Sequence, residues 1–482
     1  ETDLTYWEED PEAAVKALNN CYTYLGNMDE QLYSEAMTDN AYTKQPNDFT
    51  QNIGNGSYST ADSYVKKVSD GRYTGIRMCN ELLENIDRVP DLDTDLKKRY
   101  IGEAKVLRAY NYYELYTKFG DVPYTTKVLS IKESMSIART DRATVIANML
   151  ADLDEVINGN YLPTSYDADN KGRITRWAAM AIKAKIYLFE GNWMQVKNIT
   201  STIMTEGGFK LFGSYAGLFE IANEYNSEVI LDAQYRPTSR EHQMMYAFLP
   251  PSLGGYSQLS PLEELVDSYI MLDGKTIKET GTSFDETHPY ANRDPRLKAT
   301  VMYTGNSYTL VDGTEVEINC EKGEGKDGYG VGSDCSATGY YIKKYWDNTY
   351  RATLYSGLNP ILIRYADILL MNAEALAELG ELDKTAWDAT IKPIRDRAGF
   401  TLASAVEFPE GASKDKLIEI VRNERRSELA LEGHRHKDII RWRIADDVLN
   451  GWCHGLKTNE VVGTDNGYVR VENRTFNANR HY

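Results

Sequence analysis

Apolar side chains recur at spacings of three and four residues over several long segments, which is the period of an amphipathic α-helix. The pattern is clearest over 101–119, 175–190 and 362–379. A glycine follows each of these segments, as expected for a residue that commonly ends helices. We expect further helices over 10–25, 62–88, 141–157, 261–271 and 414–432.

Two segments have the pattern of the first half of a helical hairpin. Residues 184–193 lead into a predicted helix over 194–205, and residues 373–382 lead into 383–398. A small residue, a large residue and a glycine at the turn are typical of tetratricopeptide-like pairs. Because the spacing between the copies is irregular, we predict helix pairs inside a larger fold rather than a repeat array.

Between about 207 and 360 the helical pattern gives way to Gly, Pro, Asn, Asp and aromatic residues. Short β-like runs remain, including one over 308–318 with Asp312-Gly313 as a hairpin turn. The predicted fold is therefore mostly α, with an irregular, loop-rich region and short β-hairpins. We expect a single domain over 1–482, with a helical scaffold at about 1–206 and 360–450 and a ligand-facing region at about 207–360.

Composition and charge exclude several classes of partner and site. The net charge of −18 argues against nucleic acid or an anionic membrane surface as a partner. No stretch approaches the roughly 20 apolar residues that span a bilayer. The chain begins without a signal peptide, as a mature or trimmed sequence would. Its cysteines lack CxxC spacing, and Cys320 and Cys335 are equally compatible with a disulfide or with two free thiols.

The richest motif lies at 422–442. Glu424, Glu428 and Glu432 recur every fourth residue and are predicted to share one helix face, with arginines within a turn. A glycine then separates this helix from a second one. An ion-pair network is favoured over catalysis, because each acid has an arginine within reach.

No motif predicts a catalytic or metal-binding residue. The segment Gly323–Gly332 lacks the strand and helix that a phosphate-binding loop needs, and His434-x-His436 lacks further ligands at a suitable spacing. Paired carboxylates for glycoside hydrolysis stay open, because two such acids can lie far apart in sequence. We expect no cofactor; calcium stays open on the acidic balance alone.

Tyrosine is abundant, with 35 residues against 11 phenylalanines. An aromatic face beside Asn and Asp suits a sugar, which stacks its apolar face and directs its hydroxyls to polar groups. For each loop aromatic the alternative is packing onto the scaffold. We expect binding to rest on the loops at 40–60, 246–260 and 340–352. The candidate carbohydrate-binding residues are Tyr42, Phe49, Asn55, Tyr58, Tyr256, Trp346, Asp347, Asn348 and Tyr350.

The 423–442 segment, Asn-Glu-Arg-Arg-Ser-Glu-Leu-Ala-Leu-Glu-Gly-His-Arg-His-Lys-Asp-Ile-Ile-Arg-Trp, resembles the signature of the SusD/RagB family of surface glycan-binding lipoproteins of Bacteroidetes. Further blocks resemble the same family, in the same order along the chain. They lie at 102–113 with 119–123, at 172–179, at 294–300, at 364–374 and at 394–399.

The resemblance implies a SusD-like fold with tetratricopeptide-like helix pairs and a location on the extracellular face of the outer membrane. It implies capture of an oligosaccharide without catalysis, and delivery to a SusC-like TonB-dependent transporter. Anchoring would use an N-terminal lipid on a cysteine that is absent from this chain. No binding residue follows from the resemblance, because the conspicuous blocks are scaffold blocks.

Three other functions remain as alternatives at this point. A peptide-capturing member of the same family would bind peptides in place of glycans. A tetratricopeptide-type adaptor would bind only proteins. A helical glycosidase would turn over a glycan and would lose that activity on Asp or Glu substitution.

Overall fold

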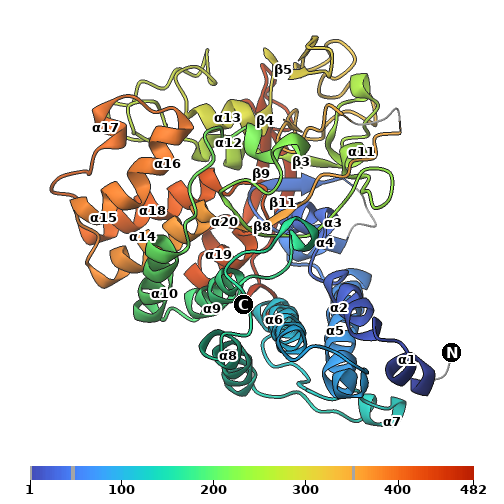
Figure 1. Ribbon diagram of the computed structural model, residues 1–482. Coiled ribbons are helices and arrows are strands. Elements are labelled where there is room, and N and C mark those ends of the chain that lie inside the picture. The colour runs from blue at the N-terminus through green and yellow to red at the C-terminus, as the bar shows by residue number, and fades with distance from the viewer. Residues whose placement is uncertain (1–2, 45–48, 350–352) are drawn as a thin grey trace. The chain divides into compact units, whose positions relative to one another are not determined.

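The protein is described by a computed structural model covering residues 1–482 except 1–2, 45–48 and 350–352 (Figure 1). Its contacts divide the chain into two compact units. Unit 1 comprises 1–26, 63–208 and 230–233, and unit 2 comprises 27–62, 209–229 and 234–482. The expectation of one domain over 1–482 stays a prediction.

Unit 1 is built of helices around α6, Thr94–Phe119, which contacts α2, α5, α8 and α9. Buried residues occupy every side of α6 from Val106 to Thr117, as expected for a central helix. The helices are α1 Asp3–Glu9, α2 Ala13–Tyr22, α5 Ser63–Asn85, α6, α7 Ile131–Ser134, α8 Arg142–Asn158, α9 Arg176–Phe189 and α10 Trp193–Glu206, with 3-10 turns η2 Ile86–Arg88 and η3 Ala168–Asn170.

Side-chain caps begin several of these helices. Asp93 accepts from the backbone N–H groups of Asp95 and Leu96 at the start of α6. Thr175 and Asn192 cap α9 and α10 in the same way, which satisfies N–H groups that have no partner within the helix. The pair α9 and α10 confirms the predicted hairpin at 184–205.

The helices of unit 2 are shorter, apart from α14 and α18. They are α3 Met28–Tyr33, α4 Phe49–Gly54, α11 Met244–Phe248, α12 Glu263–Ser268, α13 Pro295–Thr300, α14 Tyr365–Leu379, α15 Lys384–Ala389, α16 Ile391–Ala398, α17 Ala403–Val406, α18 Lys414–Glu428, α19 Arg435–Trp442, α20 Ala445–Val448 and α21 Ala478–His481, with 3-10 turns η1 Ser34–Met37, η4 Gly217–Phe219, η5 Ile221–Asn223 and η6 Pro251–Leu253.

Its strands form small antiparallel sheets. β1 Ala41–Thr43 pairs with β3 Leu259–Pro261, and β4 Val301–Met302 pairs with β7 Tyr341–Ile342. β5 Asn306–Thr309 pairs with β6 Glu315–Ile318 across the Asp312-Gly313 turn, so the hairpin predicted over 308–318 is confirmed. β11 Tyr468–Arg474 lies between β9 Gly451–Lys457 and β10 Thr464–Asp465. Two further strands are β8 Ile361–Arg364 of unit 2 and β2 Val229–Asp232, whose residues 230–232 belong to unit 1.

The mostly α fold with short strand pairs is thus confirmed, with local corrections to helix lengths. The helix predicted over 414–432 ends at Glu428, because Leu431 has a φ of 63° that a right-handed helix does not allow. The helix predicted over 261–271 spans 263–268. In the described part of the chain, no helix has both the length and the apolar character needed to cross a membrane.

Candidate functional site

The acids of the 422–442 motif are buried in a charge network of unit 2. Glu428 accepts from Arg364 at 2.7 Å and from Arg296 at 2.8 Å, and it also pairs with Arg397. Glu424 lies 2.8 Å from both Arg296 and Arg395. Glu432 lies beyond the end of α18, so it does not share the helix face as predicted. It nevertheless joins the network, through Arg364 and Lys344, each at 2.7 Å.

The electrostatics of this network support a structural role. Burial alone would raise the pKa of Glu428, but Arg397, Arg364 and Arg296 hold that pKa below its ordinary value. The same balance lowers the pKa values of Glu424 and Glu432. A general acid needs a carboxyl that holds its proton near neutral pH, and these carboxyls do not. The network is therefore a set of fixed ion pairs.

The structure brings two of the predicted binding loops together. Tyr42 of β1 lies opposite Ser260 of β3, so the stretch 40–60 is joined to the stretch 246–260. The hydroxyl of Tyr42 accepts from Gln51 Nε2 at 3.2 Å. Lys44, just after β1, donates to the backbone oxygen of Cys335 at 2.9 Å.

Tyr256 presents an aromatic surface to solvent. Tyr256 is 47% exposed, and its ring stacks on that of Tyr246, with centroids 5.7 Å apart and an interplanar angle of 12°. The two glycines before it make this loop conformation available. Gly254 has a φ of 85°, and a Cβ on Gly255 would lie 2.1 Å from the backbone oxygen of Leu249.

Other candidate residues make contacts within the fold. The Trp346 indole N–H donates to the backbone oxygen of Thr309 at 2.8 Å, and its ring packs edge-on against Tyr308. The buried Asp347 carboxylate accepts from Thr349 and Ser356 hydroxyls, each at 2.6 Å. Asn348 is exposed.

Asn55 and Tyr58 contact the C-terminal segment. Asn55 Nδ2 donates to Glu472 Oε1 at 3.1 Å, and the Tyr58 hydroxyl donates to the backbone oxygen of Arg480 at 3.0 Å. Tyr350 and the side chain of Phe49 lie outside the described residues. A role in binding stays a prediction for every residue of the candidate set.

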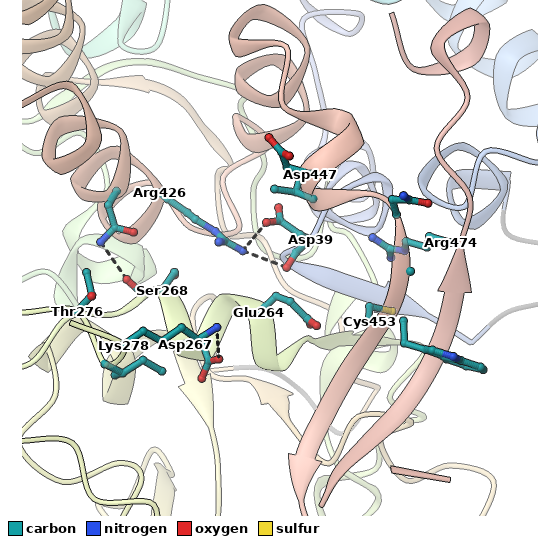
Figure 2. Close-up of a pocket in the computed structure, with 16 residues that line it drawn as sticks. Asp39, Glu264, Asp267, Ser268, Thr276, Lys278, Arg426, Asp447, Cys453 and Arg474 are labelled. Atoms are coloured by element: carbon teal, nitrogen blue, oxygen red, sulfur yellow. Dashed lines mark hydrogen bonds and ion pairs between the residues drawn. The ribbon is translucent and has the colours of Figure 1, made fainter. Parts of the chain in front are cut away.

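A polar pocket of about 400 Å³ in unit 2 was not anticipated from the sequence (Figure 2). This volume lies within the usual range for small-molecule sites. The carboxylates of Glu264 and Asp267 on α12 line it, together with Asn423 on α18 and Trp452 on β9. Trp452 is 42% exposed, and the Arg470 guanidinium lies 5.4 Å from its ring centroid.

The basic side chains of the pocket already make ion pairs and hydrogen bonds with other residues of the chain. Arg426 lies 3.0 Å from Asp39 and donates to Asn40 at 2.9 Å, and Arg474 donates to Glu472 at 3.0 Å. Figure 2 shows the contacts of Arg426 with Asp39 and of Lys278 with Asp267.

The acids of α12 also have protein partners. Burial raises the pKa of Asp267, against the charge of Lys278 and a hydrogen bond with Glu263. Glu264 Oε1 lies 2.8 Å from His454 Nδ1. Carboxylate and amide groups beside a tryptophan suit a hydroxyl-rich ligand better than an anion. The turn and aromatic sequence Asn450-Gly451-Trp452 was the signal in the chain that could have marked this region.

Among the described residues, no group of three or more His, Cys, Asp or Glu side chains is arranged to hold a metal ion. All five cysteines lie in the described part of the chain and are buried free thiols, Cys320 and Cys335 among them.

Two family models match the chain. The model described as the SusD family matches residues 218–481, and the model described as "starch-binding associating with outer membrane" matches residues 12–188.

Individual relatives agree. SusD-like protein P25 of Formosa agariphila is 26% identical over 92% of this chain and 88% of its own. A solved SusD-like carbohydrate binding protein from Bacteroides fragilis is 27% identical, with a TM-score of 0.87 over 99% of this chain and 97% of that one. A solved laminarin binding SusD-like protein is 25% identical, with a TM-score of 0.70 over 90% of this chain and 92% of that one.

Proposed function

The chain belongs to the SusD family, and from this premise we propose that it binds oligosaccharide without catalysis. The observation that carries the proposal is the solvent-exposed stack of Tyr256 on Tyr246, in a loop joined through β3 to the stretch 40–60. A flat, rigid aromatic pair offers a sugar ring apolar contact at little entropic cost. The names of two solved relatives, one carbohydrate binding and one laminarin binding, support the ligand class.

We also propose a cellular location and a partner protein. The protein would act on the extracellular face of the outer membrane, held by an N-terminal lipid in its precursor, and would deliver its glycan to a SusC-like TonB-dependent transporter. The family description of outer-membrane association supports this. Co-purification of a transporter from native outer membranes is the expected result, and a chain recovered without any transporter would favour the adaptor alternative.

Titration calorimetry against a panel of glycans, laminarin oligosaccharides included, tests the binding itself. We expect Tyr256→Ala to weaken binding of the best glycan about tenfold, or about 1.4 kcal/mol, because the stacking surface is lost. EDTA should leave the affinity unchanged, since we propose binding without a cofactor.

Trp452→Ala is the comparison variant, because it removes an exposed aromatic from the polar pocket, the other place whose lining suits a hydroxyl-rich ligand. The affinity of this variant should stay within about twofold of the parent's. The change in binding free energy should therefore be well under the 1.4 kcal/mol of a tenfold change. If Trp452→Ala weakened binding more than Tyr256→Ala did, the polar pocket would be the glycan site instead. Binding of peptides with no glycan bound would favour the peptide-capturing alternative, and glycan turnover lost on Asp267→Asn would establish a glycosidase.

A further inference from the structure

Two buried thiols meet in unit 1, where α2 packs against α5. Cys21 and Cys79 are each 0% exposed, and the Cys79 thiol is close enough to raise the pKa of Cys21. Cys21 Sγ also donates to the backbone oxygen of Ala17 at 3.3 Å.

Contacts around the thiols hold the two helices close together. Asn20 Nδ2 lies 3.0 Å from Met78 Sδ, and each of these residues directly precedes a cysteine. A Cβ added to Gly75 would lie 2.7 Å from the Cβ of Tyr24. Gly75 is one helical turn from Cys79, and Tyr24 lies three residues after Cys21, so the close approach occurs beside the thiols. A disulfide needs Cβ atoms within roughly 4.5 Å of each other, and segments that approach this closely can bring two cysteines to that separation.

The other cysteines have different surroundings. Cys335 Sγ donates to the backbone oxygen of Lys326, and Cys453 Sγ donates to that of Glu472, each at 3.3 Å. Burial and then the charges of Asp327 and Glu321 raise the pKa of Cys320, the other member of the pair that the sequence left open, whereas the Cys79 thiol is the first cause for Cys21.

We propose that Cys21 and Cys79 form a disulfide when the chain folds in the presence of a disulfide oxidant, such as oxidised glutathione or an extracytoplasmic thiol oxidase. One cysteine thiolate attacks the oxidant disulfide and releases one reduced thiol. The second cysteine then attacks the mixed disulfide, closes the Cys21–Cys79 bond and releases the other reduced thiol. The pair loses two protons and two electrons, and the oxidant disulfide is reduced to two thiols.

The bond would form before α2 and α5 are fully packed. The Cys79 thiol and then burial raise the pKa of Cys21 in the folded state, which disfavours the attacking thiolate there. The chain leaves unit 1 after Gly26 and returns at Ser63, so the bond would close the loop that contains the segment 27–62. That segment carries Tyr42, Asn55 and Tyr58. The disulfide rests on the proposed function in one respect, because the proposed surface location would supply the oxidising conditions.

The bond itself is tested without any glycan. The full chain is reduced, refolded with reduced and oxidised glutathione, quenched in acid, and alkylated in denaturant without reductant. Peptide mapping should recover the Cys21 and Cys79 peptides as a cross-linked pair, with Cys320, Cys335 and Cys453 alkylated. Quantitative alkylation of Cys21 and Cys79, or their pairing with other cysteines, would overturn the proposal.

Thermal unfolding of variants gives a second readout. The oxidised parent should melt several degrees above the reduced parent, because the cross-link restricts the unfolded chain. Cys79→Ser should abolish that difference, and Cys453→Ser, at another buried thiol, should retain it. If Cys79→Ser does not fold, the peptide map of the parent alone tests whether Cys21 and Cys79 form the disulfide. A failure to bind glycan would leave both readouts unaffected.

Discussion

Glu428 shows what a single residue requires in order to stay ionised inside unit 2. Its carboxylate is fully buried and contacts the guanidinium groups of Arg296, Arg364 and Arg397. Such an arrangement adds little stability over a well-packed apolar core, but removing one partner leaves uncompensated charge in a medium of low polarity. The cost of a substitution here therefore comes mainly from the charges that remain.

Glu428→Gln should lower the free energy of unfolding by about 3–5 kcal/mol. The amide keeps the size of the side chain but directs N–H groups at arginines that also donate. Chemical denaturation followed by circular dichroism measures the change. Glu419→Gln is the control on the same helix, because Glu419 is exposed and pairs with the exposed Lys416, so its effect should stay under about 0.5 kcal/mol. Equal effects of the two substitutions would contradict a buried network.

The sequence predicted the ion pairs of 422–442 but not their partners. Local spacing suggested arginines within a turn, whereas Arg425 pairs with Asp367 and Asp438, and Arg422 with Glu378. The partners of Glu428 come from distant segments, and no local pattern encodes which distant charges meet. For the same reason, the pocket of Figure 2 could not be predicted, since α12, α18 and β9 supply its walls.

At the scale of elements, α5 contains two glycines, Gly71 and Gly75, whose surroundings differ. Gly75 faces Tyr24 of the α2 segment and Asn111 of α6, whereas nothing lies within 4 Å of a Cβ placed on Gly71. Periodicity predicted this helix to within a few residues, because its apolar face is regular. Periodicity could not distinguish the two glycines, because the difference depends on which helices pack against each one.

Gly71→Ala and Gly75→Ala should therefore change stability in opposite directions. Gly71→Ala should raise the free energy of unfolding by up to about 1 kcal/mol, through helix propensity and a less flexible unfolded chain. Gly75→Ala should lower it by about 1–3 kcal/mol, because the new methyl group forces α2 and α5 apart. Parallel urea denaturation of the two variants measures both changes, and stabilisation by Gly75→Ala would show that the helix contact is looser than described.

At the scale of the whole molecule, both units are assembled from separated stretches of chain. Unit 1 is completed by residues 230–233, and unit 2 begins with 27–62 before the chain returns to unit 1. The family blocks meet within each unit. Glu103 of the 102–113 block lies 3.2 Å from Arg173 of the 172–179 block in unit 1, and the 294–300, 364–374 and 394–399 blocks supply arginines to Glu424 and Glu428 in unit 2.

Because neither unit is one continuous segment, we expect the chain to unfold in a single calorimetric transition. Glu428→Gln in unit 2 and Gly75→Ala in unit 1 should each shift that one transition to lower temperature. Two resolved transitions, each moved by one of the variants, would show that the units unfold independently and would contradict a single domain over 1–482.

The charge network of unit 2 also has a kinetic consequence. Arg364 and Glu228 are 136 residues apart, and Arg296 and Glu428 are 132 apart, so these ions stay hydrated until distant segments have closed long loops. Contacts that form after the folding barrier slow the opening of the native state and leave the speed of folding almost unchanged. We therefore expect these ion pairs mainly to slow the unfolding of the native state.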